Sequence, residues 1–321
     1  EFFPGAVFKE IVSLRDCMCG EEFSVASYNQ RRENLFIIRE NHDFWKPCPC
    51  SPRSVSCGYQ VLNVGFGCGY ECVYCFLQGY QNVPGIILPA NIEDFFRHFD
   101  LATHTRMPFG KVRVGSGEFT DSLLYDAITG FSLQIIDFFK TKQKAVFEFK
   151  TKSTTVDAIL HCRPQSNIVI SWSVNPQRVI REHEFFTPSF QSRIRAASSC
   201  AKAGFKIGFH FDPLIYYPEW EHDYRAVVQD IFDCIPTRSL AWISLGALRM
   251  NPNVKKVIEN RFPHDTLMNG ELILGYDEKL RYPKHIRIHM YRKMKEWIRQ
   301  RSRLVCIYLC MEEQSVYRAW K

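Results

Sequence analysis

Short apolar segments alternate with helix-like segments along most of the chain, and this alternation restricts the fold more than any other feature. Strand-like runs lie at 61–65, 112–115, 145–149, 168–173, 205–209, 240–245 and 304–309. Helix-like segments lie at 91–99, 131–139, 156–161, 188–203, 223–234 and 285–303. Because strand–helix–strand units build parallel sheets, the pattern predicts an α/β fold. Six or seven units fit an open or partial barrel better than a closed barrel of eight.

One helix has clear end signals. Thr187 is the expected N-cap, Pro188 the first helical residue, and Gly204 the stop.

The chain divides into three expected parts. Residues 1–60 form an irregular N-terminal extension that contains Cys and Pro, residues 61–250 form the barrel, and residues 251–321 form a C-terminal segment that packs on the barrel. No apolar run reaches the roughly 18–20 residues that span a bilayer, and no signal-peptide pattern is present. Thirteen cysteines in a chain of 321 residues are too sparse for a secreted disulfide scaffold. We therefore expect a cytoplasmic protein with no membrane partner.

Three cysteines with metal-ligand spacing follow the first predicted strand. Cys68, Cys72 and Cys75 form a C-x3-C-x2-C motif. Three thiolates this close together can hold one cubane cluster and leave its fourth iron without a protein ligand. A structural zinc site would want four ligands, usually in two separated pairs, and buried free thiols are the other alternative. The spacing favours a [4Fe–4S] cluster with an open iron.

Seven ordered matches between residues 46 and 320 make the chain resemble the spore photoproduct lyase family of the radical S-adenosylmethionine (SAM) superfamily. They lie at 72–80 (CVYCFLQGY), 115–123 (GSGEFTDSL), 149–153 (FKTKS), 171–176 (SWSVNP), 208–213 (GFHFDP), 242–246 (WISLG) and 308–312 (YLCME). The resemblance implies a partial (β/α)6 barrel that holds the cluster and SAM. Reductive cleavage of SAM then gives a 5′-deoxyadenosyl radical, which abstracts hydrogen from the substrate.

In the family's lyase, the substrate is a methylene-bridged thymine dimer in DNA that is flipped into the pocket. The resemblance therefore implies an enzyme, a lyase that cleaves a carbon–carbon or carbon–nitrogen bond. It also implies a reductant such as flavodoxin or ferredoxin as partner.

The resemblance also assigns roles to residues at strand ends. Glu118 or Thr120 would accept from the SAM ammonium, Lys152 would pair with its carboxylate, and Ser173 would add a hydrogen bond. Tyr74 and Glu118 are the expected catalytic residues. The structural alternatives are a solvated lysine, capping hydroxyls and a surface glutamate.

Two departures from the family pattern concern the return of hydrogen to the product. The lyase uses a cysteine just before Thr120 as hydrogen-atom donor, but residues 115–120 contain none. The family's tyrosine after the third cluster cysteine is Phe76 here, which has no hydroxyl. A different substrate, or a different donor such as Tyr74 or a cysteine brought in by folding, is therefore required.

Substrate contacts and a second metal are further expectations. Arg281 and Tyr282 resemble the family segment that wedges into DNA, with an ordinary exposed loop as the alternative. His210 at a strand end is either a substrate contact or a structural histidine. Cys48, Cys50 and Cys57, with Cys17 and Cys19 upstream, either bind a second cluster or metal or are free thiols.

Three functions remain open from the sequence. The first is radical SAM lyase chemistry on a nucleic-acid lesion, favoured by the net charge of +7 and by ten Lys and Arg between residues 279 and 303. The second is a radical SAM lyase for a modified nucleoside such as queuosine or another small substrate, favoured by the missing cysteine and by Phe76. The third is a metal-containing nucleic-acid-binding protein without turnover.

Overall fold

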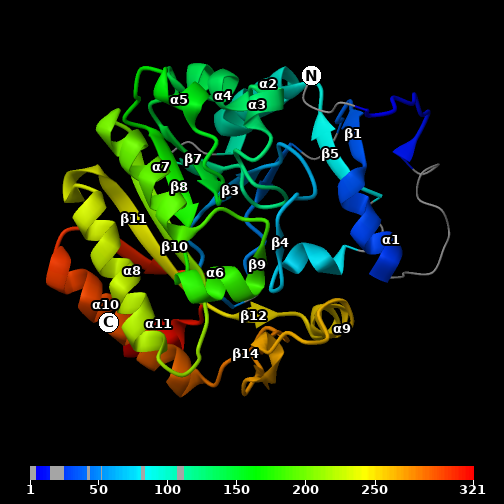
Figure 1. The fold of residues 1–321 in the computed structure, drawn as a ribbon. Helices are drawn as coiled ribbons and strands as arrows, with labels where there is room; N and C mark the ends of the chain where they lie inside the picture. Colours follow the sequence, from blue (N-terminus) through cyan, green and yellow to red (C-terminus); the bar gives the residue numbers. More distant parts are fainter. Residues whose placement is uncertain (1–4, 15–24, 42–43, 52, 81–83, 107–111) are drawn as a thin grey trace.

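An eight-stranded, largely parallel sheet organises the computed structural model, which describes residues 5–14, 25–41, 44–51, 53–80, 84–106 and 112–321 (Figure 1). The strand order is β15-β11-β10-β8-β7-β6-β3-β2, and only the edge pair β2–β3 is antiparallel. The bounds are β2 Trp45–Pro47, β3 Gln60–Leu62, β6 Val112–Gly115, β7 Ala145–Thr151, β8 Ile168–Ser173, β10 Lys206–Leu214, β11 Leu240–Ala247 and β15 Cys306–Leu309. Because β2 and β15 are both edges, the sheet does not close, and the predicted partial α/β barrel is confirmed.

The central strands are continuous apolar runs because both faces of the sheet are covered. All six residues of β8 are buried, and Ile207, Phe209 and Phe211 on β10 are fully buried. Near-continuous burial of this kind is typical of parallel strands between two layers. The same strands end in polar residues, such as Ser173 and His210, which points the functional groups toward one edge of the sheet.

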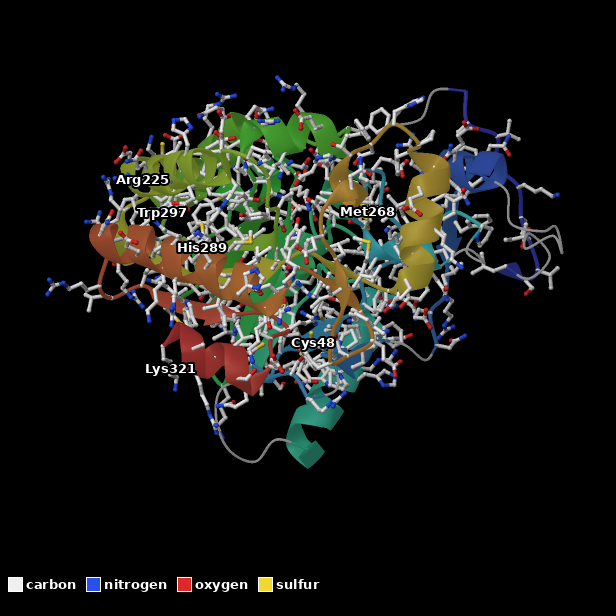
Figure 2. The ribbon with its side chains drawn as sticks, turned by 90° about the horizontal axis from the view of Figure 1, so that it is seen from below. Cys48, Arg225, Met268, His289, Trp297 and Lys321 are labelled. Atoms are coloured by element: carbon white, nitrogen blue, oxygen red, sulfur yellow. The ribbon has the colours of Figure 1, made fainter. Side chains whose placement is uncertain are left out.

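Helices cover the outer side of the sheet (Figure 1). These helices include α2 Ile92–Arg106, α4 Phe131–Phe139, α7 Phe190–Lys202, α8 Trp220–Cys234 and α10 Lys284–Arg301. Figure 2 shows α10 beside α8, and Trp297 of α10 lies with its ring centroid 5.8 Å from that of Trp220. The other α-helices of the described residues are α1 Val25–Gln30, α3 Asp126–Thr129, α5 Asp157–Leu160, α6 Gln177–His183, α9 Pro252–Arg261 and α11 Gln314–Trp320.

The start of α7 differs from its prediction by two residues. Ser189, and not Thr187, is the N-cap, and its hydroxyl accepts from the Ser192 amide at 3.2 Å. The Thr187 hydroxyl is already used: it donates to the Glu184 carbonyl and accepts from Arg193. The predicted stop is confirmed, because Gly204 has a φ of +99°, a value that favours glycine.

Strands from all three predicted parts of the chain belong to the main sheet, since β2 lies before residue 61 and β15 after residue 250. The remaining strands form small sheets: β1 Leu35–Ile38 with β5 Ile86–Pro89, β4 Glu71–Cys72 with β9 Glu184–Phe185, and β12 Arg249–Met250 with β14 Leu280–Arg281 and β13 Ile273–Leu274. Within the described residues, none of the helices combines the length and the apolar character needed to cross a membrane.

Candidate active site

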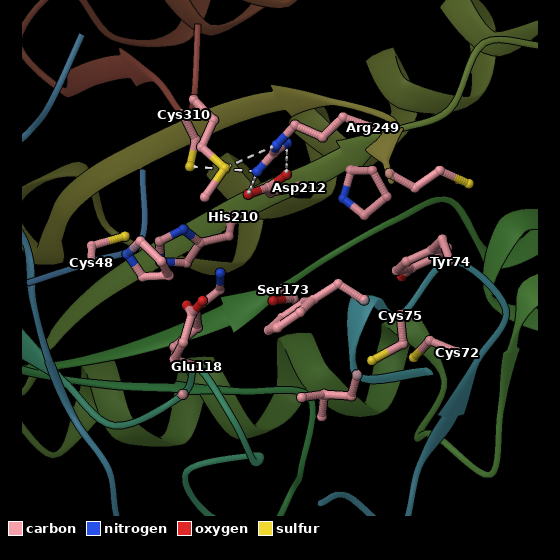
Figure 3. Close-up of a pocket in the computed structure, with 18 of the residues that line it drawn as sticks. Cys48, Cys72, Tyr74, Cys75, Glu118, Ser173, His210, Asp212, Arg249 and Cys310 are labelled. Carbon is pink, nitrogen blue, oxygen red and sulfur yellow. Dashed lines mark hydrogen bonds and ion pairs between the residues drawn. The ribbon is translucent and has the colours of Figure 1, made fainter. Parts of the chain in front are cut away.

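A cavity of about 570 Å³ lies at the carboxyl ends of the parallel strands (Figure 3). This volume suits a small-molecule cofactor or substrate. Its wall includes Lys150 and Lys152 around the end of β7, Ser173 of β8, and His210 and Asp212 of β10. Strand-end positions are where α/β folds place reacting groups, so this cavity is the candidate active site.

The three motif cysteines line one wall of this cavity. Their loop is held firmly: the Val73 amide donates to the His183 carbonyl at 2.9 Å, and the Gln78 side-chain amide donates to the carbonyls of Cys72 and Val73. Short pairing of β4 with β9 adds a second attachment. The local backbone is therefore fixed by contacts outside the motif itself.

The surroundings of Cys68, Cys72 and Cys75 suit a cubane cluster. Burial raises the pKa of the Cys72 thiol to about 12, while the nearby Lys152 charge acts in the opposite direction. Among the residues that the structure describes, no three His, Cys, Asp or Glu side chains converge on a point that could hold a single metal ion. Cubane ligands have no need to converge, because each thiolate binds a different iron. Three thiols on one short loop are therefore a donor set that a cubane cluster can use.

A buried ion pair lies next to the cluster wall, the cavity wall that contains Cys68, Cys72 and Cys75. Glu184 Oε2 accepts from Arg193 Nη2 at 2.6 Å, and Glu184 Oε1 accepts from Asn175 at 2.8 Å and from the Tyr74 hydroxyl. Burial works to raise the pKa of Glu184, but the charges of Arg193 and Lys152 outweigh it and lower the pKa to about 2. Tyr74 thus lines the cavity while its hydroxyl is engaged by a carboxylate.

The four residues predicted to bind SAM all line the cavity: Glu118, Thr120, Lys152 and Ser173. The Thr120 hydroxyl is buried and has no hydrogen-bond partner in the described part of the protein. It is therefore free to accept from a bound ammonium. Burial raises the pKa of Glu118, and the charge of Lys150 opposes this. The structure thus brings the four predicted residues together around one cavity, and their roles toward SAM stay a prediction.

Asp121 is a key residue that the sequence analysis missed. Its carboxylate accepts from the Leu123 and Leu124 amides at 3.0 Å each, and from the Lys152 amide at 2.6 Å. The carboxylate also accepts from the Thr151 hydroxyl at 2.5 Å. These bonds tie residues 115–123 to the end of β7. The sequence could have pointed to Asp121, because this residue directly follows Thr120 in the matched stretch 115–123.

A buried polar chain connects β7, β8, β10 and β11, and two of its members, Glu148 and His210, line the floor of the cavity. His210 was predicted as a substrate contact or a structural histidine, whereas its partner Glu148 was missed. Glu148 Oε1 lies 2.6 Å from His210 Nε2 and accepts from the Ser171 hydroxyl. His210 Nδ1 lies 2.5 Å from the Ser244 hydroxyl. Both ring nitrogens of His210 are therefore engaged by the protein. Beside this chain, Arg249 pairs with Asp212, with Nη1 2.7 Å from Oδ1.

Comparison with known proteins supplies the family. The model of the family described as spore photoproduct lyase matches residues 46–301. The chain belongs to the spore photoproduct lyase family. Spore photoproduct lyase of Clostridium acetobutylicum is 26% identical over 75% of this chain and 70% of its own, and that of Geobacillus sp. (strain Y412MC61) is 29% identical over 77% and 71%.

Solved structures agree on the fold. A spore photoproduct lyase variant with bound AdoMet and dinucleoside spore photoproduct has a TM-score of 0.78 at 23% identity, covering 94% of this chain and 88% of its own. The predicted partial α/β barrel is thereby confirmed as the fold of this structure as well. As a member of this family, the chain is a radical SAM lyase, and SAM and a [4Fe–4S] cluster are the cofactors of that superfamily.

Two residues expected to contact substrate lie elsewhere. Arg281 is 1% exposed, and its guanidinium donates to both carboxylate oxygens of Asp277 at 2.9 and 2.6 Å. Tyr282 is 2% exposed, and its hydroxyl accepts from the Tyr216 amide at 3.1 Å. Neither lines the cavity and both are buried, whereas a wedge into DNA needs exposed side chains; their contact with substrate stays a prediction. The physical reason is that Asp277 and the fold supply partners that draw both side chains inward.

Cys48, Cys50, Cys57 and Cys310 also line the cavity, and Figure 3 shows Cys48 and Cys310 on the side away from Cys72 and Cys75. Cys48 Sγ and Cys50 Sγ are 3.8 Å apart. In the described ranges no group of three potential ligands gathers around a metal position here, and Cys17 and Cys19 lie outside those ranges. A second cluster or metal remains a prediction from the sequence.

Proposed function

We propose that this protein reductively cleaves SAM and uses the resulting 5′-deoxyadenosyl radical to reverse a methylene-bridged thymine dimer, breaking a carbon–carbon bond. One observation carries the proposal: the thiols of Cys68, Cys72 and Cys75 face the same cavity as Glu118, Lys152 and Ser173. Cluster ligands and candidate SAM ligands thus share one chamber of about 570 Å³.

Each residue has a defined task in this proposal. Cys68, Cys72 and Cys75 hold the cluster. Lys152 neutralises the SAM carboxylate, and Ser173 donates a hydrogen bond to it. Glu118 or Thr120 accepts from the SAM ammonium. When bound, the cluster and SAM supply a radical that removes one hydrogen atom from the substrate.

The remaining residues shield and orient. Tyr74 closes one side of the cavity, with its hydroxyl fixed on Glu184. His210 is held on both nitrogens, so it shapes the floor of the cavity and is not free to move. The proposed electron donor is a flavodoxin or ferredoxin, and the proposed location is the cytoplasm.

The substrate class has precedent in the family, since the neighbouring solved structure contains dinucleoside spore photoproduct. A second candidate is a modified nucleoside such as queuosine. A specific observation favours it: residues 115–120 contain Glu118 but no cysteine, and the residue after the third motif cysteine is Phe76. The hypothesis of a binding protein without turnover is set aside, because the family consists of enzymes.

The test is anaerobic turnover of the reconstituted protein with dithionite and SAM. Dinucleoside spore photoproduct should be converted to two thymidines with formation of 5′-deoxyadenosine. Conversion of queuosine-type nucleosides with no conversion of the dinucleoside would select the second candidate. Absence of 5′-deoxyadenosine despite an intact four-iron cluster in EPR would overturn both.

A further inference from the structure

A surface outside the cavity lies directly beside the cluster loop, residues 68–75. Strand β9 pairs with β4 so that Cys72 lies opposite Glu184, and Phe185 lies opposite Glu71. Side chains alternate between the two faces of such a ladder. Cys72 and Glu184 are buried on one face, whereas Phe185 is 37% exposed on the other. The exposed face of this ladder is therefore one strand away from a predicted cluster ligand.

Phe186 extends the exposed apolar surface. Its side chain is 70% exposed, and its φ of +64° is a left-handed value that is uncommon for a bulky residue. The ring of Phe185 contacts that of Phe262, with centroids 5.9 Å apart, which holds Phe185 in place. Neither Phe185 nor Phe186 lines the cavity, so binding of SAM or substrate does not explain their exposure. Large apolar side chains that are exposed side by side mark interaction surfaces.

Three arginines share one carboxylate beside the two phenylalanines. The guanidinium carbon of Arg32 lies 4.4 Å from the ring centroid of Phe186, and Arg32 Nη1 is 3.2 Å from Glu71 Oε2. Arg261 Nη2 is 2.5 Å from Oε1 of the same glutamate. Arg31 has no ion pair among the described residues, so this group carries an excess of positive charge. The aromatic–basic patch consists of Arg31, Arg32, Phe185 and Phe186.

The aromatic–basic patch is joined to the cluster loop by a short chain of hydrogen bonds. Arg261 Nη1 donates to Gln78 Oε1 at 2.6 Å, and Gln78 Nε2 donates to the carbonyls of Cys72 and Val73. Figure 1 shows α1, which ends just before Arg31, on the same side of the molecule as α9, which contains Arg261. The path from Arg261 to the backbone of a cluster ligand thus runs through one side chain.

The proposed reaction needs an electron that reaches the cluster from outside the protein. Electron tunnelling falls steeply with distance, so a protein donor has to dock close to the cluster. SAM and substrate would occupy the cavity side of the cluster loop, because the candidate SAM ligands line the same cavity as the motif cysteines. The aromatic–basic patch lies outside that cavity and beside the loop, where an approaching donor would not compete with SAM.

We propose that the aromatic–basic patch is the docking surface for a flavodoxin-type reductant, an inference that rests on the proposed function. Such a protein is acidic around its flavin, and the flavin exposes an apolar aromatic edge. The arginines would attract the acidic rim, while Phe185 and Phe186 would pack against the flavin edge. A ferredoxin screens its cluster with its own backbone, so it would use the positive charge without the exposed rings. The two phenylalanines therefore favour a flavin as the docked group.

One electron moves across this surface. The fully reduced flavin of the partner is oxidised by one electron, the cluster is reduced by one electron, and no bond forms or breaks. Dithionite delivers the same electron as a small solute that needs no docking surface. A comparison of the two reductants therefore isolates the contribution of the aromatic–basic patch.

Turnover with each reductant tests the proposal. Release of 5′-deoxyadenosine is driven by reduced flavodoxin or by saturating dithionite, in the wild type and in the double variant Arg31→Gln with Phe186→Asn. Asn is chosen because it tolerates a left-handed backbone. We expect the KM for flavodoxin to rise about tenfold, since a charge and an apolar anchor are lost from the interface. The dithionite-driven rate should stay at the wild-type value, because neither residue lines the cavity.

The matched control is the double variant Arg303→Gln with Leu304→Asn. Leu304 is 92% exposed, and both residues lie just before β15, at the amino end of a strand and so away from the cavity. The control removes one positive charge and one exposed apolar side chain, and the KM for flavodoxin should not change. Arg31→Gln and Phe186→Asn are also made singly, so that the variant at the exposed Phe186 carries the test if the double variant loses its iron.

A second measurement needs no turnover. Flavodoxin is immobilised on a sensor surface, and its Kd for the reconstituted protein is measured by surface plasmon resonance. We expect the patch double variant to bind about tenfold more weakly than the wild type. Wild-type binding should also weaken between about 50 and about 300 mM salt, because salt screens the attraction between exposed charges. Equal affinity of the wild type and the patch double variant at both salt concentrations would overturn the docking surface.

The outcomes separate the docking surface from the proposed function. A wild type that releases no 5′-deoxyadenosine with dithionite would overturn the proposed function. A wild type that is active with both reductants, with an unchanged flavodoxin KM in the patch variants, would overturn the docking surface alone. An equal rise of KM in the patch and control variants would do the same. Activity with dithionite or ferredoxin but none with flavodoxin would overturn the choice of partner.

Discussion

The two walls of the cavity differ in how closely they follow the family. The cluster wall keeps the three motif cysteines, Tyr74 and the predicted SAM lysine, Lys152. The opposite wall has Glu118 in a stretch without cysteine, and its thiols come from Cys48, Cys50 and Cys310. The cluster wall thus keeps these residues, with Phe76 as its departure from the family pattern, while the opposite wall lacks the family's cysteine.

Electrostatics follow the same division. The charge of Lys152 acts to lower the pKa of Cys72, Cys75 and Glu184. The charge of Lys150, two residues earlier in the chain, acts to lower the pKa of two groups of the opposite wall, Glu118 and Asp212. Two lysines of one strand end therefore serve different walls, and each wall can be altered separately.

The largest effect is expected from Cys72→Ala on the cluster wall. Loss of one thiolate should abolish the four-iron cluster and lower release of 5′-deoxyadenosine by on the order of a hundredfold or more. Iron analysis, EPR and product assay measure this. Cys306→Ala is the control, because Cys306 is exposed and lies outside the cavity. Full iron content with normal turnover in Cys72→Ala would show that this motif does not hold the cluster.

The next effect concerns the buried pair behind the cluster wall. Arg193→Met leaves the fully buried carboxylate of Glu184 without its cation, which should lower the free energy of unfolding by about 3–5 kcal/mol. Denaturant unfolding measures the change. Arg178→Met is the matched control: Arg178 pairs with Glu182 on the surface, and about 0–1 kcal/mol is expected. Equal losses in both variants would show that burial does not set the strength of the pair.

The pattern of apolar runs predicted the sheet well, because its central parallel strands are buried and need continuous apolar residues that are visible in the sequence. It missed short elements such as β1, β2 and α9, whose stability depends on contacts with distant segments. The motif spacing also predicted that Cys68, Cys72 and Cys75 share a wall, since all three lie on one short loop.

The sequence did not show which charged side chains pair with residues that are distant along the chain. The basic run at 279–303 favoured nucleic acid, yet Arg287 donates to Glu312, Arg292 to the Ala319 carbonyl, and Arg299 to the Val305 carbonyl. Arg281 is likewise paired within the protein, with Asp277. A count of charges cannot distinguish a charge that faces solvent from one that the fold neutralises. The same limit hid the meeting of Cys48 and Cys50 with Glu118.

A moderate effect should distinguish the two lysines at the end of β7. Lys152→Met removes the proposed partner of the SAM carboxylate, and a lost charge-assisted hydrogen bond of about 1.5–3 kcal/mol weakens SAM binding roughly 10- to 100-fold. Lys150→Met, the matched control, should change SAM affinity by less than about threefold. Equilibrium binding of SAM to the reconstituted protein measures both. Equal weakening of SAM binding in the two variants would show that Lys152 is not the specific partner of the SAM carboxylate.

The smallest effect is a pH dependence on the opposite wall. Burial tends to raise the pKa of Asp212, but the charge of Arg249 outweighs it and holds the pKa well below its usual range. A depressed folded-state pKa stabilises the protein above the unfolded value of roughly 3.9, and this stabilisation is lost as pH falls toward the folded value. Between pH 6 and pH 3 the wild type should therefore lose about 1 kcal/mol more unfolding free energy than Asp212→Asn, which has no carboxylate to protonate. Urea unfolding at the two pH values measures the difference. Parallel losses in the two proteins would show that the Asp212–Arg249 pair does not stabilise this wall through its charge, whereas a gap confined to acid would confirm that it does.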